Sequence, residues 1–217
     1  MKKIFFLIFL FPVFAFGQWV ELIGGVNQSF YYDRLDETPH YSSNYTTGNG
    51  YSFSVAADQI YFDSVRFRLE LGIHQYSGEL FARNGALGGS YSHEIYFSKT
   101  LLSLSVYPIN FSLFENLRIG AGLKYEFLLF EDYNGYAYGW QMAESWTKDI
   151  NDQYDSYANK SLVGVVACIS YHVQVTKKVF ICPQYTFTFG LNNEFKYLPD
   201  AAKAFRQYLQ VGIGKQF

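Results

Sequence analysis

The chain has 217 residues, a formal net charge of −2 and a mean hydropathy of −0.05. Its length fits one domain, and so small a charge excludes a strongly charged partner such as nucleic acid. Aromatic residues make up 21% of the chain, with 20 Tyr and 22 Phe. So many rings without net hydrophobicity are typical of strands that are apolar on one side only, with aromatic belts at both membrane interfaces.

The N-terminus has the pattern of a secretory signal. Met1–Lys3 is cationic, Ile4–Phe14 is almost entirely apolar, and Ala15–Gly17 supplies small residues at a cleavage point. The sequence therefore predicts a signal peptide over residues 1–17 and a mature domain over 18–217. The apolar run is too short to cross a bilayer as a helix, which takes roughly 20 residues.

Alternating side chains predict strands along the mature chain. In Val65–His74 every second residue is apolar, and Leu117–Leu129 and Val179–Leu191 repeat the pattern. Period two over such lengths indicates a strand with one apolar face. Five weaker segments show the same alternation: residues 20–32, 51–61, 91–107, 161–175 and 205–217.

Eight strands predict an all-β fold, an eight-stranded antiparallel up-and-down transmembrane β-barrel, because closure leaves no edge unpaired in lipid. The segment 91–107 is the least regular, since Ile95 and Phe97 have one parity and Leu102 and Leu104 the other. A β-bulge near residues 99–100 would reconcile the two halves.

The lengths of the connections predict an orientation. Long joins (33–50, 77–90, 131–160 and 192–204) alternate with short ones (62–64, 108–116 and 176–178). Outer-membrane barrels keep short turns in the periplasm and long loops outside. Both termini are therefore expected in the periplasm, although a lipocalin-like soluble barrel would show part of this alternation.

Several segments carry a family resemblance: Ala15–Gln18, Phe67–Gly72, Leu117–Gly122 and the terminal Phe217. With them the chain resembles the small outer-membrane β-barrel families common in Bacteroidota, such as the PorT-like and OmpA-like barrel domains. The resemblance implies the cell outer membrane, with Phe217 as the C-terminal barrel-assembly signal. It implies architecture and no particular activity.

The partners expected from this reading are outer-membrane lipid, the barrel-assembly machinery during insertion, and other outer-membrane or periplasmic proteins. No cofactor, metal or nucleic acid is expected. The favoured function is structural or interactive, in envelope integrity or as a subunit of an outer-membrane complex. The alternatives are a small gated channel and a lipid A-modifying hydrolase.

Charged residues of the strands are expected to point into the lumen. They are Glu21, Arg66, Arg68, Glu70, His74, Arg118, Lys124 and Glu126. An eight-stranded barrel is only wide enough for its own side chains, so these residues predict an ion-paired plug. A narrow gated conduit is the alternative, because strand number excludes only a wide pore.

Two further patterns point to chemistry only weakly. His40 and Ser42 resemble the His-x-Ser pair of membrane-embedded lipid A deacylases, in which an imidazole activates a hydroxyl. The alternative is ordinary turn composition, and no catalytic residue is predicted. His74, His93 and His172 show no metal-ligand spacing, so they are interpreted as polar fill.

The two cysteines are expected to be free thiols. If Val175 pairs with Val179 across a turn, Cys168 lies opposite Thr186, four residues from Cys182. Four residues along a strand span about 13 Å, which is beyond disulfide reach.

The join over residues 131–160 is the candidate binding region. It contains Tyr133, Tyr136, Tyr138, Trp140, Trp146, Tyr154 and Tyr157 among small polar and acidic residues. Rigid amphipathic rings interleaved with such residues are typical of recognition surfaces. The alternative is that the strands extend beyond the membrane and the rings pack on one another.

Overall fold

The computed structural model describes residues 19–32, 41–62, 65–86, 89–114, 116–141, 144–149, 158–196 and 202–217. These ranges form one antiparallel sheet of eleven strands. The strands are β1 (Trp19–Tyr32), β2 (Tyr41–Thr46), β3 (Gly48–Phe62), β4 (Val65–Ala86), β5 (Gly89–Ser112), β6 (Leu117–Gln141), β7 (Glu144–Asp149), β8 (Ser161–Tyr171), β9 (Val173–Gln174), β10 (Val179–Gly190) and β11 (Lys203–Gln216). Within them, no helix of the length and hydropathy needed to cross a bilayer is present.

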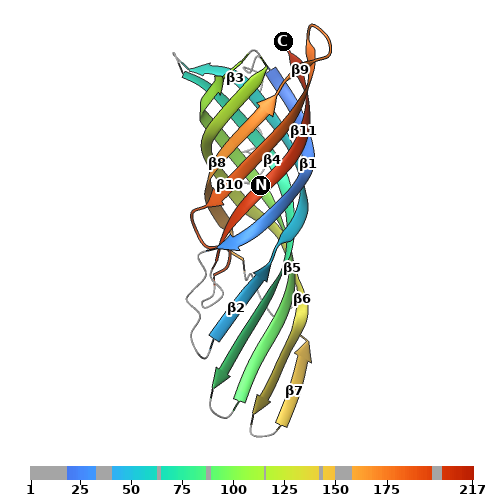
Figure 1. Ribbon diagram of the computed structural model, residues 1–217, viewed down its shortest axis with the longest axis vertical. Coiled ribbons are helices and arrows are strands. Elements are labelled where there is room, and N and C mark those ends of the chain that lie inside the picture. Colours follow the sequence, from blue (N-terminus) through green and yellow to red (C-terminus); the bar gives the residue numbers. More distant parts are fainter. Residues whose placement is uncertain are drawn as a thin grey trace, which may run out of the picture.

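Eight of these strands close into a barrel (Figure 1). The ring runs β1, β3, β4, β5, β6, β8, β10, β11 and returns to β1, which pairs with both β3 and β11. Every pairing in the ring is antiparallel. The predicted eight-stranded up-and-down barrel is confirmed.

The two ends of the barrel differ. At one end, here called the turn end, the first and last strands meet as Trp19 pairs with Gln216. The tight β9–β10 turn lies at the same end, where Val175 donates its amide to the carbonyl of Val179 over 2.9 Å. The opposite end, here called the loop end, carries a large extension (Figure 1).

Strands β4, β5 and β6 run on beyond the loop end and form that extension with β2 and β7 (Figure 1). We call this five-stranded part the outer sheet. Residues 131–141 and 144–149 of the expected long join are therefore strand, as in the alternative in which the strands extend beyond the barrel. Residues 77–86 and 89–90 are strand for the same reason: outside the barrel these hairpins still pair their backbone groups with each other.

The side of β5 that is apolar changes between the barrel and the outer sheet. In the barrel Leu102 and Leu104 point outward, whereas in the outer sheet Ile95 and Phe97 are buried on the inner face. The predicted bulge near residues 99–100 is absent from the ladder with β4, which stays in register from Tyr107 to Gly89, but a register shift does lie between Thr100 and Leu101 in the ladder with β6. An apolar exterior requires an apolar solvent, whereas an apolar interior is the ordinary pattern in water. The switch therefore follows the surroundings of the strand and needs no break in its backbone.

The irregularity in this region lies in β6 instead. Leu128 and Phe130 pair with consecutive residues of β5, so Leu129 is an extra residue. Before this bulge the even-numbered Glu126 faces inward, and after it the odd-numbered Tyr133 does. The bulge thus brings the aromatic half of β6 into step with the inner face of β5.

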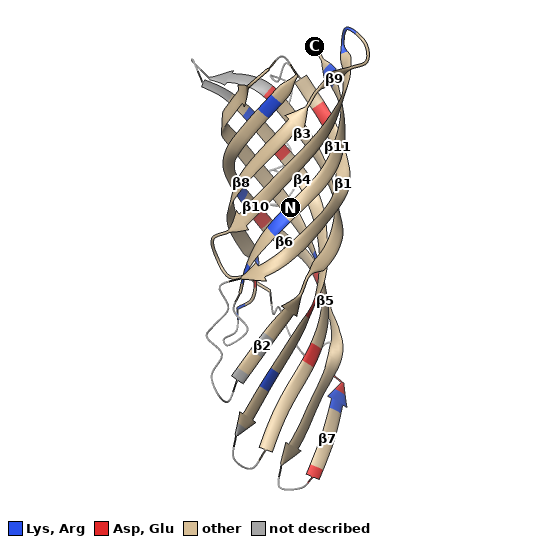
Figure 2. Ribbon diagram, in the orientation of Figure 1, with Lys and Arg blue, Asp and Glu red and all other residues tan. Residues whose placement is uncertain are grey.

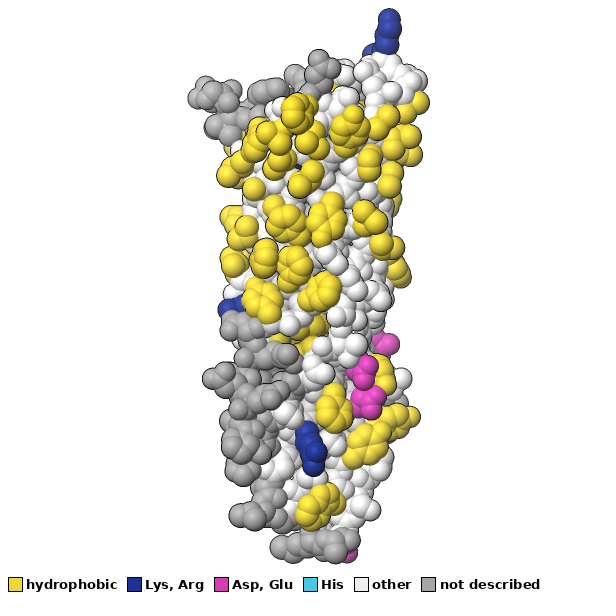
Figure 3. Space-filling model, in the orientation of Figure 1, with side chains coloured by type: hydrophobic (Ala, Val, Ile, Leu, Met, Phe, Trp, Pro, Cys, Tyr) yellow, Lys and Arg dark blue, Asp and Glu magenta, His cyan; other side chains and the backbone are white. Residues whose placement is uncertain are grey.

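Buried side chains hold the outer sheet against the barrel mouth. They are Leu80, Ala82, Ile95, Phe97, Tyr133, Ala137 and Phe195, with Tyr31, Tyr45 and Tyr91 packed around them. The ring of Tyr45 stacks on Tyr31 at 4.8 Å and on Phe195 at 5.5 Å. The outer surfaces of the barrel and the outer sheet also differ. Figure 3 shows a broad apolar band over the barrel that gives way to mixed charged and apolar side chains on the outer sheet.

This division predicts a position-dependent cost for a charge on β6. Leu123 lies outward at the middle of the barrel wall and is 59% exposed, whereas Tyr138 lies outward on the outer sheet. In lipid vesicles, Leu123→Arg is expected to lower the free energy of unfolding by about 2–4 kcal/mol because the cation meets hydrocarbon. Tyr138→Arg is expected to change it by less than about 0.5 kcal/mol.

Urea unfolding of the reconstituted protein, followed by tryptophan fluorescence, measures both effects. Equal costs for Leu123→Arg and Tyr138→Arg would contradict a lipid-facing barrel wall.

Candidate functional site: the lumen and the outer sheet

The charged residues predicted to face inward lie on the barrel strands β1, β4 and β6, and Figure 2 marks the basic and acidic positions of the ribbon in colour. Seven of them are buried in the lumen: Glu21, Arg68, Glu70, His74, Arg118, Lys124 and Glu126. The eighth, Arg66, lies on β4, and its side chain is outside the described residues. Charges removed from water in this way must pair with one another, and six of the seven residues do so in two groups. His74 instead lies 2.5 Å from the hydroxyl of Ser103.

The first group lies toward the loop end and is a chain of five alternating charges. Lys99 Nζ lies 2.7 Å from one oxygen of Glu194, and Arg206 lies 2.6 Å from the other. Arg206 also contacts Glu126 at 3.1 Å, and Lys124 contacts the second oxygen of Glu126 at 3.0 Å. Each carboxylate is thus shared by two cations, so the group crosses the lumen without an interruption.

Two tyrosines surround this chain. Tyr76 donates to Glu126 over 2.9 Å, and its hydroxyl lies 2.6 Å from that of Tyr208. The guanidinium of Arg206 lies 4.2 Å from the centre of the Tyr76 ring, and Lys124 Nζ lies 4.3 Å from that of Tyr208. Rings and charges therefore fill the same cross-section of the barrel.

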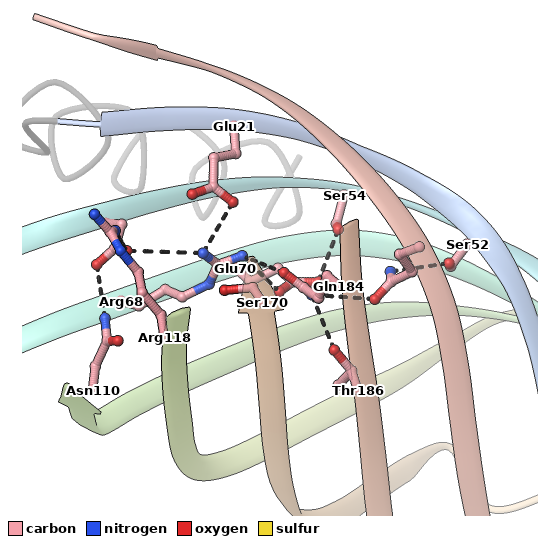
Figure 4. Close-up of polar contacts among 12 residues, drawn as sticks. Glu21, Ser52, Ser54, Arg68, Glu70, Asn110, Arg118, Ser170, Gln184 and Thr186 are labelled. Carbon is pink, nitrogen blue, oxygen red and sulfur yellow. Dashed lines mark hydrogen bonds and ion pairs between the residues drawn. The ribbon is translucent and has the colours of Figure 1, made fainter. Parts of the chain in front are cut away.

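The second group lies toward the turn end (Figure 4). Arg68 pairs with Glu21 at 3.0 Å and lies 3.8 Å from Glu70. Arg118 pairs with Asp58 at 2.5 Å, and Asp58 also lies 4.0 Å from Arg68. Two guanidinium groups therefore bridge three carboxylates among the described side chains.

Amides and hydroxyls connect this group to the barrel wall (Figure 4). Gln184 accepts from Arg68 over 2.9 Å and donates to Thr186 over 3.0 Å. Ser54 donates to Glu70 over 2.8 Å. Such bonds restrict the rotamers of these long side chains.

Glu194 and Phe195, here called the capping segment, cover the loop end of the lumen. Phe195 is 1% exposed and forms an isolated bridge with Ala158. Its ring lies 4.5 Å from Lys99 Nζ, at the end of the charge chain. The neighbouring Glu194 is held by its backbone, donating to the carbonyl of Ala202 over 2.6 Å. This segment therefore supplies both an apolar cover and a carboxylate to the lumen.

Four charged members of the two groups were not among the sequence candidates: Asp58, Lys99, Glu194 and Arg206. Arg206 shares its parity with Tyr208 and Gln210, so the alternation of the last strand could have placed it inside. Lys99 was missed because a bulge was expected at residues 99–100, so the direction of its side chain could not be assigned from the alternation. Glu194 lies in a join that was expected to face the medium. The alternation of side chains that identifies inward residues of a strand does not apply to a join, so it could not show that Glu194 enters the barrel.

The aromatic residues of the binding region fall into separate places. Tyr133 is buried in the core of the outer sheet, and its hydroxyl donates to Glu131 over 2.6 Å. Burial and this carboxylate raise the pKa of Tyr133. Trp146 covers Gly139 on the inner face, 5.7 Å from the ring of Tyr91. Tyr154 and Tyr157 lie outside the described residues.

The remaining rings share one surface with two aromatic residues of β4 and β5. We call it the outer aromatic face, and it comprises Phe81, Tyr96, Tyr136, Tyr138 and Trp140, each 40–48% exposed. At its barrel side lies a groove of ≈ 390 Å³ lined by Tyr96, Glu79, Asp132 and Asn134 among others. Rings beside carboxylates and amides are the groups with which proteins recognise polar ligands that have an apolar side.

The weaker sequence candidates have these outcomes. Ser42 lies on β2 opposite Arg83, while His40 is outside the described residues, so the His-Ser pair has no described geometry. Cys168 and Cys182 are both free and buried. The predicted pairing of Cys168 with Thr186 is confirmed, and with it the prediction of two free thiols.

No protein-family model and no curated protein sequence matches this chain. Among solved structures it is similar to Neisserial surface protein A (10% identity, 92% of this chain and 96% of that chain, TM-score 0.42) and to the outer membrane protein OprG from Pseudomonas aeruginosa (13%, 93% and 96%, TM-score 0.43). A third is the outer membrane protein AlkL in lipid bilayers (10%, 93% and 91%, TM-score 0.41). OprG and AlkL are named as outer membrane proteins, but likenesses this low carry no argument about activity.

The loop-end charge chain predicts a large effect of removing its central cation. Arg206→Met is expected to destabilise the barrel by about 3–5 kcal/mol, because Glu126 and Glu194 each lose a partner while remaining buried. Urea unfolding in detergent micelles measures the change. Arg83→Met, at an exposed position of β4, is the matched control and should cost less than about 0.5 kcal/mol. Equal stability of Arg206→Met and the wild type would show that the chain of charges does not support the barrel.

Proposed function

We propose that this chain is an outer-membrane β-barrel, closed by its own side chains, that holds a binding surface outside the bilayer. Both termini then lie in the periplasm, and the outer sheet lies in the external medium. The role is one of interaction: the barrel anchors the outer aromatic face, and that face binds a partner of the cell envelope or its surroundings.

The observation that carries this proposal is the change of apolar side along β5. The outward Leu102 and Leu104 fit a barrel surrounded by hydrocarbon, whereas the inward, buried Ile95 and Phe97 fit a sheet surrounded by water. The strand therefore has the pattern of a chain that leaves a membrane. The turn end has only short joins, and the loop end carries the outer sheet. Outer-membrane barrels place short turns in the periplasm, which supports the orientation.

The filled lumen favours an anchor over a channel. The loop-end charges, the two tyrosines and the capping Phe195 occupy the cross-section through which a solute would pass. A conducting path would require this bonded group to separate in a low-dielectric interior, at a high cost in free energy. Stepwise currents from the purified protein in planar bilayers would contradict the closed lumen.

The orientation predicts which engineered thiols are accessible in intact cells. Tyr138→Cys, on the outer sheet, is expected to react with a membrane-impermeant maleimide, and Lys177→Cys, in the turn beside Val179, only after the outer membrane is permeabilised. The native Cys168 and Cys182 are buried, so the wild type should give little background. Labelling of Lys177→Cys but not Tyr138→Cys in intact cells would reverse the orientation.

The binding surface predicts where a partner can be captured. A photo-crosslinking amino acid in place of Tyr138 is expected to give adducts in living cells, because this position is exposed on the outer aromatic face. The same group in place of Leu123, on the barrel wall of the same strand, is the matched control and should give none with a soluble partner. Adducts at position 138 that vanish in Tyr136→Ala would tie capture to the face. Absence of any adduct at position 138 would contradict the proposed binding role.

A further inference from the structure

We propose that the turn end of the lumen binds a divalent transition metal ion, such as Zn²⁺, on Glu21, His172 and Cys182. The donor atoms of these three residues all lie within 4.8 Å of one another. All three residues are buried, with exposed fractions of 0%, 3% and 0%. This site is separate from the outer aromatic face and does not depend on the binding role proposed for it.

The barrel register brings the three residues together from distant parts of the chain. Cys182 on β10 and Glu21 on β1 flank β11, where they pair with Gly212 and Gly214 respectively. His172 lies between β8 and β9, beside the pair formed by β9 and β10. No spacing in the sequence reveals this set, because closure of the barrel is what makes β1 and β10 neighbours of the same strand.

The glycines of β11 leave room for side chains of the neighbouring strands beside the donors. A Cβ atom at Gly212 would lie 3.5 Å from Cβ of Cys182 and 3.3 Å from Ile23. A Cβ atom at Gly214 would clash with the ring of Phe180, at 2.0 Å. Glycine at position 214 therefore makes room for Phe180, the ring on which His172 stacks.

The two oxygens of Glu21 have different surroundings. Oε2 accepts a hydrogen bond from Arg68 over 3.0 Å. Oε1 accepts none from the described residues and lies 3.8 Å from Nε2 of His172. That separation is too long for a hydrogen bond, but two donors placed about 2.0–2.3 Å from one ion are themselves roughly 3.3–3.8 Å apart. The geometry thus fits two ligands of a shared cation.

Neighbouring rings fix the imidazole. His172 stacks on Phe180 with centroids 4.7 Å apart and lies 5.2 Å from Trp19. These contacts restrict the orientation of the ring and with it the direction of the nitrogen lone pairs. The indole of Trp19 is itself held by the guanidinium of Arg118, 3.9 Å from its centre.

The donor set determines which ions fit. Thiolate, imidazole and carboxylate together are typical of Zn²⁺ and Co²⁺, and they exclude Ca²⁺ and Mg²⁺, which prefer oxygen. Binding forms a metal–sulfur bond and releases the thiol proton to solvent. The divalent ion adds two positive charges and the proton removes one, so the net charge of the site rises by one. Glu21, Asp58 and Glu70 oppose the repulsion from Arg68 and Arg118. Three protein ligands leave a fourth position for water.

Cobalt titration tests this site directly. The purified full chain in detergent, stripped with a chelator, is expected to take up one Co²⁺ and to develop a thiolate-to-cobalt charge-transfer band with the visible bands of a tetrahedral ion. Cys182→Ser should abolish the charge-transfer band. Cys168→Ser is the matched control, because Cys168 is also buried and lies on the neighbouring strand β8, and it should leave the band unchanged.

A second variant separates ligation from folding. Glu21→Gln retains an acceptor for Arg68 and is expected to weaken Co²⁺ binding by about tenfold or more. Heat-dependent migration on gels reports the folded barrel for each variant. Absence of the charge-transfer band in the folded wild type, or its persistence in Cys182→Ser, would overturn the proposal. Loss of crosslinking on the outer sheet would not affect it, so failure of the two proposals can be distinguished.

Discussion

The structure depends on one constraint: charged side chains on a barrel wall with an apolar exterior can be accommodated only inside. The outward positions of the barrel strands carry Leu, Val, Ile and aromatic residues, so the lumen receives the arginines, lysines and carboxylates. Because few water molecules can share such a narrow space, each charge must be satisfied by another side chain. The shared carboxylates Glu126 and Glu194 and the bridging Arg206 are the result, and they fill the barrel as a consequence of being paired.

The same constraint explains how much the sequence could predict. Alternation along Val65–His74 reports which side of a strand meets lipid, and eight such segments are enough for the barrel. The register of β8 and β10 also followed from one turn, and so did the free thiols. The charge set was incomplete because Glu194 enters the lumen from a join, where the path of the chain is set by tertiary contacts alone.

In the outer sheet, the alternation of apolar side chains could not be interpreted from one strand alone. The irregular parity of 91–107 has two possible origins, an extra residue or a change of surroundings, and the sequence of one strand cannot distinguish them. The neighbouring strands decide: β4 and β5 pair without interruption, so the surroundings change. The extra residue is Leu129 of β6, at a position where the expected strand was already ending. Polar and glycine-rich composition suggested a loop, although paired strands with one apolar face tolerate the same residues in water.

The proposed closure of the lumen also determines where specificity can reside. Solutes that cannot enter the barrel can be distinguished only at its ends, and the two ends are built differently. The loop end offers a broad sheet whose inner face packs on Phe195 near the barrel, while its outer aromatic face is exposed to a partner. The turn end offers three buried donors behind short turns, which are suited to an ion and too enclosed for a larger ligand. The proposed cation at the turn end and the proposed partner of the outer aromatic face would therefore act independently, since the paired charges of the lumen lie between the two ends.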